Sequence, residues 1–101
     1  MNKKSYENFF INFANKTKLD IILCLKEGEM RAGKIAECIG EEQSTVSHNL
    51  KKLADCNVLR VKKIGKERIY SLNKDTVLPL LKLVEKHVKT CCSKNCEVCK
   101  C

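Results

Sequence analysis

Apolar residues follow a helical spacing in five segments of the chain and a strand-like pattern in two others. The clearest helical segment is 42–53, where Val46, Leu50 and Leu53 fall on one face at 3.6 residues per turn. The opposite face carries short polar and basic side chains: Ser44, Ser47, His48, Lys51 and Lys52. One face of this helix is therefore expected to pack, and the other to stay free for contacts.

Two further helices are predicted before this segment. Residues 5–15 place an aromatic stripe on one helix face, made of Tyr6, Phe9, Phe10 and Phe13. The stripe suits a helix packed on its own core and a helix that helps to form a dimer equally well. Residues 16–27 predict the second helix, with Leu19, Ile22 and Leu23 on its inner face and a stop at Gly28.

A short helix is predicted directly before segment 42–53. Residues 29–31 are long enough for only a connecting strand or turn, and residues 33–39 then form a short amphipathic helix closed by Gly40. A short helix, a tight turn and a second amphipathic helix make a helix-turn-helix, whose second helix conventionally enters the major groove of DNA.

A basic hairpin is predicted after the helix-turn-helix. Residues 58–64 and 67–72 are predicted strands joined across Gly65-Lys66. Their tip gathers Lys62, Lys63, Lys66 and Arg68. Position and charge agree, so phosphate contact by a wing is favoured over a merely solvated cluster.

A final helix is expected from near residue 74 or 75 to about Thr90, capped by Asn73. Pro79 is acceptable only in its first turn. Its apolar seam, made of Val77, Leu80, Leu81, Val84 and Val88, favours a homodimer. The expected fold is mainly α with a β-hairpin: a winged helix-turn-helix of order α-α-(β)-α-α-β-β-α that dimerises through its terminal helices. Residues 1–90 form this domain, and residues 91–101 are a cysteine-rich tail.

Size and charge narrow the class of partner. A chain of 101 residues has room for one domain, and its formal charge of +8 favours an anionic partner, with nucleic acid first and an anionic membrane surface second. No apolar run approaches the length of a spanning helix, and the N-terminus leads into an amphipathic segment rather than a signal peptide. We therefore expect a cytoplasmic protein with no membrane partner.

The eight cysteines fall into two groups. Cys24, Cys38 and Cys56 stand singly, and Cys24 is expected to be a small buried apolar residue rather than a ligand. The other five crowd the tail: Cys91, Cys92, Cys96, Cys99 and Cys101. A terminal cluster cannot staple residues 1–90 together, so metal binding or redox sensing is the better interpretation.

The runs Q-S-T-V-S-H-N-L-K-K-L, A-D-C-N-V-L and R-V-K-K-I-G-K-E-R-I-Y-S-L carry a family resemblance. Over roughly residues 16–72 the chain resembles the ArsR/SmtB family of winged-helix metalloregulatory repressors. Members of that family are homodimers that release double-stranded operator DNA when a metal or metalloid binds. The resemblance assigns operator recognition to Gln43, Ser44, Thr45, Ser47 and His48, and the wing to Lys62, Lys63, Lys66 and Arg68; Lys51, on the outward face of the reading helix, completes the DNA-binding set.

The family's sensing sites carry over only in part. The Cys-x-Cys pair of many arsenic-responsive members is not matched, because segment 31–39 has Cys38 alone and at a different place. Asp75 and His87 do not have the spacing of the zinc-responsive site. The sequence Cys91-Cys92-x3-Cys96, however, resembles the vicinal-cysteine pattern that some arsenic-responsive members carry after the last helix.

Thiolates without nearby carboxylates select soft or borderline ions. Cys91, Cys92 and Cys96 offer the three sulfurs that trivalent arsenic or antimony takes, and four of the five tail cysteines offer a tetrahedral site for Cd(II), Pb(II) or Zn(II). Nearby lysines also favour thiol oxidation, so a thiol-based redox-sensing winged-helix regulator is the alternative.

Enzymatic function is not expected, and neither is an organic cofactor. The strongest enzyme alternative, a thiol oxidoreductase using Cys96-x2-Cys99, lacks the strand-to-helix setting of such enzymes. A metal-buffering protein would have no use for a wing and a reading helix.

Overall fold

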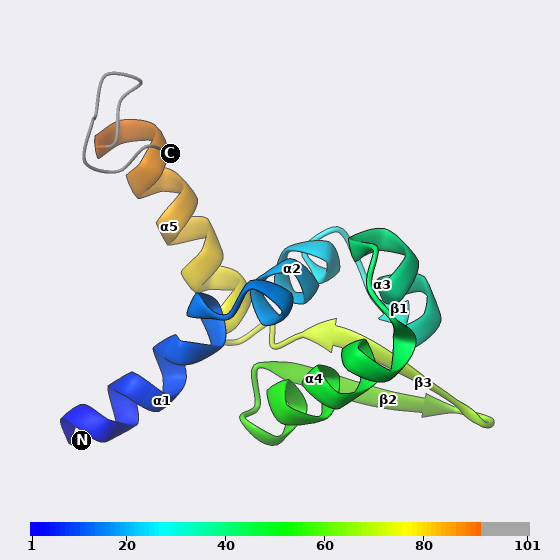
Figure 1. The fold of residues 1–101 in the computed structure, drawn as a ribbon. Helices are drawn as coiled ribbons and strands as arrows, with labels where there is room; N and C mark the ends of the chain where they lie inside the picture. Colours follow the sequence, from blue (N-terminus) through cyan, green and yellow to red (C-terminus); the bar gives the residue numbers. More distant parts are fainter. Residues whose placement is uncertain (92–101) are drawn as a thin grey trace.

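The computed structural model describes residues 1–91, which fold into five helices and one three-stranded sheet (Figure 1). The predicted order of elements is confirmed. The bounds are α1 Lys3–Ala14, α2 Lys16–Leu25, β1 Met30–Arg31, α3 Ala32–Ile39, α4 Gln43–Asp55, β2 Leu59–Ile64, β3 Glu67–Leu72 and α5 Val77–Cys91.

The core is built on α4. Val46, Leu50 and Leu53 are fully buried, as their spacing predicted, and they pack with apolar side chains of α2, α3 and the sheet. Before α4, Gly40 ends α3 with a φ of 71°, in the left-handed region that favours glycine. The tight turn of the helix-turn-helix therefore follows directly from the local sequence.

The inner face of α2 was predicted only in part: Ile22 is fully buried, as predicted. Ile21 and Leu25 are buried, whereas Leu23, which we expected to face inward, is 46% exposed. Apolar residues surround most of this helix, and α1, α3, α4 and β3 all pack against it. Periodicity could not choose the orientation because the partners, not the helix itself, decide which side is covered.

The break after α4 is a left-handed C-terminal cap. Asn57 has a φ of 59°, the Asn57 amide donates to the carbonyl of Ala54 at 3.0 Å, and the Val58 amide donates to the carbonyl of Leu53 at 3.0 Å. This is the bonding pattern of a Schellman motif with asparagine in the place of glycine. It turns the chain directly into β2.

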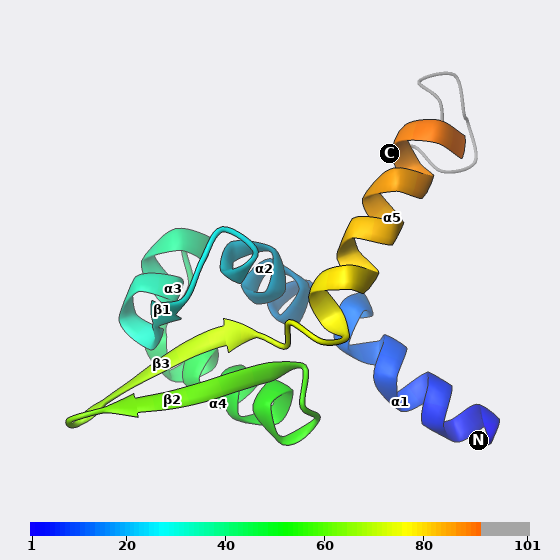
Figure 2. The same ribbon diagram turned by 180° about the vertical axis from the view of Figure 1, so that it is seen from behind.

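The sheet has the order β1-β3-β2, with both pairs antiparallel. The hairpin pairs Lys63 with Arg68 and Ile64 with Glu67, and Gly65 begins the two-residue turn with a φ of 62°. From behind, the hairpin runs along one side of α4 (Figure 2).

Asn73 organises the start of α5. Its Oδ1 accepts from the amides of Asp75 at 2.9 Å and Thr76 at 3.3 Å, and its Nδ2 donates to the carbonyl of Asn57 at 2.9 Å. The helix begins at Val77, two or three residues later than predicted, because residues 74–76 form the turn that Asn73 bonds. Pro79 still falls in the first helical turn, as required.

The terminal helices project from one end of the molecule, and the tip of the hairpin projects from the opposite end (Figure 1). Beyond its first turns α5 leaves the core: Leu81 is buried, but Val84, on the same side of the helix, is 49% exposed. On α1, Tyr6 and Phe10 are more than half exposed. Among residues 1–91, no helix has the length and apolar character to cross a membrane.

We expect Asn73→Ala to lower the free energy of unfolding by about 1–3 kcal/mol, because it leaves two amides and the Asn57 carbonyl without partners. Urea denaturation at one fixed protein concentration measures the change. Asn49→Ala is the matched control: it removes one bond within α4, from Nδ2 to the Thr45 carbonyl at 2.9 Å, and should stay within about 0.5 kcal/mol of the unmodified protein. Equal losses in the two variants would contradict the assignment.

Candidate nucleic-acid interface

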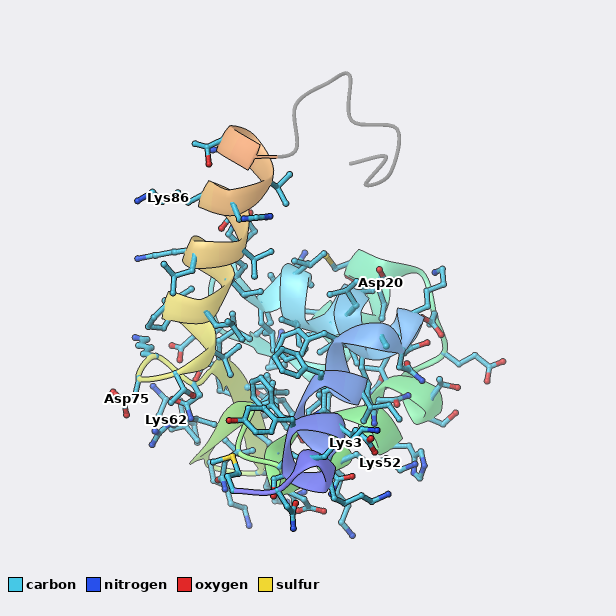
Figure 3. The ribbon with its side chains drawn as sticks, turned by 90° about the vertical axis from the view of Figure 1, so that its left-hand side faces the viewer. Lys3, Asp20, Lys52, Lys62, Asp75 and Lys86 are labelled. Atoms are coloured by element: carbon cyan, nitrogen blue, oxygen red, sulfur yellow. The ribbon has the colours of Figure 1, made fainter. Side chains whose placement is uncertain are left out.

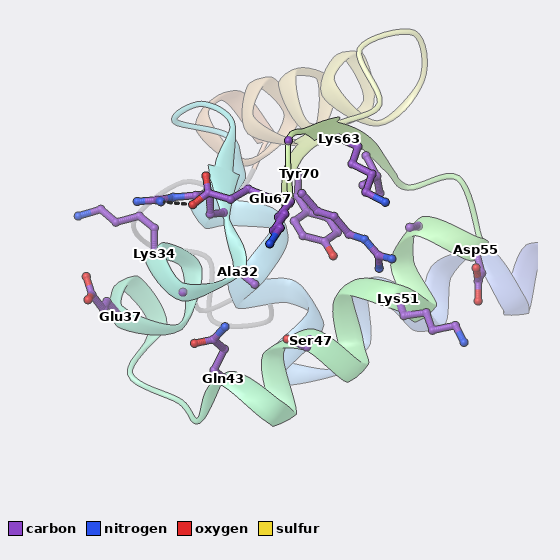
Figure 4. A pocket seen from close by; sticks show the side chains of 17 residues that line it. Ala32, Lys34, Glu37, Gln43, Ser47, Lys51, Asp55, Lys63, Glu67 and Tyr70 are labelled. Atoms are coloured by element: carbon purple, nitrogen blue, oxygen red, sulfur yellow. Dashed lines mark hydrogen bonds and ion pairs between the residues drawn. The ribbon is translucent and has the colours of Figure 1, made fainter.

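An open groove of about 1210 Å³ lies between the helix-turn-helix and the hairpin (Figure 4). One wall comes from α3 and α4, and the other from the hairpin and β1. Its charged lining consists of six basic and three acidic side chains, which leaves a formal charge of +3: Arg31, Lys34, Lys51, Lys63, Lys66 and Arg68 against Glu37, Asp55 and Glu67. The groove is therefore suited to an anion larger than a single phosphate.

The outward residues of α4 form two rows. Gln43, Ser47 and Lys51 follow one another at a spacing of four and line the groove (Figure 4). Ser44, Thr45 and His48 are exposed but do not line it, and so they form the outer edge of the helix. The residues predicted for base recognition thus share one helix, in two adjacent rows.

The four predicted cations of the hairpin do not all lie on the same side of the sheet. Residues paired across antiparallel strands point to the same face, so Lys63 and Arg68 share one face with Val61 and Tyr70, and this face lines the groove. Lys66 lies in the turn and also lines the groove.

Lys62 points to the opposite face of the sheet. Lys62 Nζ lies 3.6 Å from Glu29 Oε2. Lys62 also lines a second, smaller hollow together with Asp75. Figure 3 shows Lys62 beside Asp75 near the base of α5, well apart from Lys52 on α4. The structure therefore brings three of the four predicted wing cations to the groove and separates Lys62 from them.

Sequence reasoning missed Arg31, Lys34 and Tyr70 in the groove wall. Arg31 arrives there because β1 pairs with β3, and its Nη1 donates to Glu67 Oε1 at 2.8 Å. A two-residue strand that pairs with a segment nearly forty positions away gives no periodic signal. Lys34 had a weaker signal, as a cation in the first turn of the helix that precedes the reading helix.

The single cysteines have different surroundings. Cys24 is buried, as predicted, whereas Cys38 and Cys56 are exposed. Burial, and then a side-chain hydrogen bond with Cys38, raises the pKa of the Cys24 thiol to about 12. The backbone of Cys91 ends α5, and the predicted ligands Cys92, Cys96, Cys99 and Cys101 lie outside the described residues. Within the described part, no three side chains of His, Cys, Asp or Glu gather as a metal site.

Residues 9–72, from the middle of α1 to the end of the hairpin, match the family model described as the N-terminal domain of the methanogenesis regulatory protein FilR1. The match includes every element that lines the groove and covers well over half of the chain. The chain belongs to the FilR1 N-terminal domain family.

Similar proteins agree on the fold of this FilR1-type domain. It is 35% identical over 68 residues to the HTH-type transcriptional regulator NmtR of Mycobacterium tuberculosis; the matched part is 67% of this chain and spans 57% of the length of NmtR. The solution structure of Mb0332 from Mycobacterium bovis, a homodimeric winged helix-turn-helix DNA-binding domain and possible ArsR-family regulator, has a TM-score of 0.74 at 25% identity. The match covers 82% of this chain and 77% of the Mb0332 chain.

The crystal structure of the antimony-specific transcriptional repressor AntR has a TM-score of 0.68 at 28% identity. The match covers 81% of this chain and 75% of the AntR chain. The FilR1-type domain therefore has the winged helix-turn-helix fold of ArsR-type transcriptional regulators, and these relatives are regulators rather than enzymes.

We expect Cys24 to resist alkylation while Cys56 reacts. The thiolate is the reacting form, and at pH 8 a thiol with a pKa of about 12 is ionised in roughly one molecule in 10⁴. Below that pKa, each unit rise in pH should increase labelling of Cys24 by iodoacetamide about tenfold. Peptide mass mapping measures both residues in one sample, and equal labelling of both at pH 8 would show that Cys24 is not protected.

Proposed function

We propose that this chain is a homodimeric, DNA-binding transcriptional repressor of the ArsR type. The observation that carries the proposal is the basic groove, where a row of polar residues on α4 faces Lys63 and Arg68 on the wing. Phosphate contacts from the wing would position the protein, and side chains of α4 would reach base edges in the major groove. The predicted DNA-binding residues are Gln43, Ser44, Thr45, Ser47, His48, Lys51, Lys62, Lys63, Lys66 and Arg68.

The proposed dimer rests on the apolar surface of the terminal helices. Tyr6, Phe10 and Ile11 on α1, and Leu83 and Val84 on α5, are 49–64% exposed in the single chain. Side chains of this size cluster on a protein surface chiefly where a partner covers them. A second copy joined at this end would leave both grooves open, with two reading helices about 34 Å apart on a palindromic site.

The proposed inducer is a thiophilic metal or metalloid bound by the tail that follows the domain of residues 1–90. Trivalent arsenic or antimony is favoured, then Cd(II), Pb(II) or Zn(II), with ligands among Cys91, Cys92, Cys96, Cys99 and Cys101. AntR, which is antimony-specific by name, supports this class of inducer. Because the ligands begin where α5 ends, ion capture would act on the dimer helices; a coupling of roughly 1–3 kcal/mol would weaken operator binding several-fold or more.

Lys63→Ala should weaken binding to operator and to unrelated DNA alike. It should also reduce the slope of log affinity against log salt by about 1 for each phosphate that the variant no longer neutralises. Fluorescence anisotropy at several salt concentrations measures both effects. Lys4→Ala, which removes the same charge from exposed α1, is the control and should leave the slope unchanged.

Lys62→Ala is the sharper comparison, because Lys62 lies on the other face of the same strand. We expect a smaller loss of affinity than for Lys63→Ala. If the two variants, measured together, gave the same reduction of the salt slope, the groove would not be the phosphate-contacting surface.

Arsenite should release the reduced protein from its operator, and a Cys91→Ser/Cys92→Ser variant should bind the operator normally but fail to be released. Operator binding is titrated with arsenite, Cd(II), Zn(II) and diamide in parallel. Release by diamide alone would replace the metalloregulator with the redox-sensing alternative. Absence of a specific complex under every condition would overturn the repressor proposal itself.

A further inference from the structure

Three sulfur-bearing side chains meet where α2, β1 and α3 pack together. Cys24 on α2 is 6% exposed, and its Sγ lies 3.5 Å from Sδ of Met30 on β1. Cys38 on α3 lies near enough to Cys24 to raise the pKa of its thiol. Met30 is half-buried and Cys38 is exposed, so the cluster reaches from the core to the surface.

The donor set of this cluster is chemically narrow. Within the described residues, no trio drawn from His, Cys, Asp and Glu gathers here, so the convergent donors are two thiols and one thioether. Structural zinc takes four ligands, commonly thiolates with imidazoles, and Ca²⁺ and Mg²⁺ take oxygen. Soft thiolate and thioether ligands select Cu(I).

The spacing of the Cys24 and Met30 sulfurs also suits a small ion. Three sulfurs in a plane around an ion, each at a bond length of about 2.3 Å, lie about 4 Å from one another. The distance of 3.5 Å between Cys24 Sγ and Met30 Sδ is within a small side-chain movement of that value.

The surroundings keep the Cys24 thiol protonated when the site is empty. Burial, the Cys38 thiol and the charge of Glu27 all raise the pKa of Cys24, and Lys34 acts in the opposite direction. Two thiolates and one monovalent cation carry a charge of −1, which the Lys34 ammonium offsets in part. A divalent ion that prefers oxygen ligands would gain no binding free energy by exchanging its water ligands for these sulfurs.

We propose that Cys24, Met30 and Cys38 form a binding site for a soft monovalent cation, Cu(I), separate from the cysteines of the tail. Binding releases the two thiol protons to solvent and changes no oxidation state, because the ion enters as Cu(I). The exposed Cys38 gives the ion its entry path. A bound ion would join α2 to the first helix of the helix-turn-helix and to β1, which is paired with the wing.

The test is a Cu(I) titration without DNA, so that its failure is distinct from failure of the repressor proposal. The chain of 101 residues carries serine in place of all five tail cysteines and is titrated anaerobically against bicinchoninate, a chromogenic Cu(I) chelator. We expect one Cu(I) per chain, with a thiolate-to-copper absorption band in the ultraviolet. In the same background Cys38→Ser should abolish uptake, and Cys56→Ser, which removes another exposed thiol, should leave it intact.

Met30→Leu keeps the apolar volume and removes only the thioether, so it should weaken Cu(I) binding at least tenfold while both thiols remain. Circular dichroism confirms that each variant is folded. The proposal is overturned if Cu(I) stays with the chelator, if uptake survives Cys38→Ser, or if Cys56→Ser removes it equally. Formation of a Cys24–Cys38 disulfide by diamide in a protein that takes up no Cu(I) would assign the pair to redox chemistry instead.

Discussion

The burial of one face of α4 is the constraint on which the rest of the structure depends. Val46, Leu50 and Leu53 are fully buried, and they belong to one apolar cluster with residues of α2, α3 and the sheet. That packing fixes the rotation of α4 about its axis, which in turn fixes which side chains face outward. Any shift that exposed this face would cost several kcal/mol of apolar burial. This packing therefore sets the positions of the two outward rows of α4.

Local signals were enough to predict the helix-turn-helix and the hairpin. Gly40, Asn57 and Gly65 each have a positive φ where the sequence predicted a break, and the inward residues of α4 follow the period of a single helix. The orientation of α2 could not be predicted in the same way. Its covered side depends on which helices pack on it, and several arrangements satisfy the same apolar pattern. The start of α5 was missed by two or three residues, since the side chain of Asn73 bonds a turn that helix spacing does not reveal.

The candidate interface was predictable in its parts but not in its assembly. The basic tip and the polar face of α4 are both visible in the sequence, and the groove between them is a product of tertiary packing. The number of charges in the sequence does not distinguish Lys62 from Lys63. Their positions one residue apart on a strand place them on opposite faces, and only the register with β3 shows which of the two meets α4. Arg31 lines the groove because β1 pairs with β3, and the distance between these two strands along the sequence gives no sign of that pairing.

Contacts at the start of α5 and farther along it connect this helix to the rest of the domain. The first turns of α5 are attached to the domain by the burial of Val77 and Leu81 and by the turn that Asn73 bonds, next to which Asp75 meets Arg60 at 2.9 Å. Farther along, Glu85 pairs with Lys26 just past α2, and the Lys26 ammonium lowers the pKa of that carboxyl. A carboxyl with a lowered pKa stays ionised at neutral pH, so the pair persists there and is lost as pH falls through that pKa. Because α2 packs directly on α4, the Glu85–Lys26 pair connects α5 to the reading helix through α2.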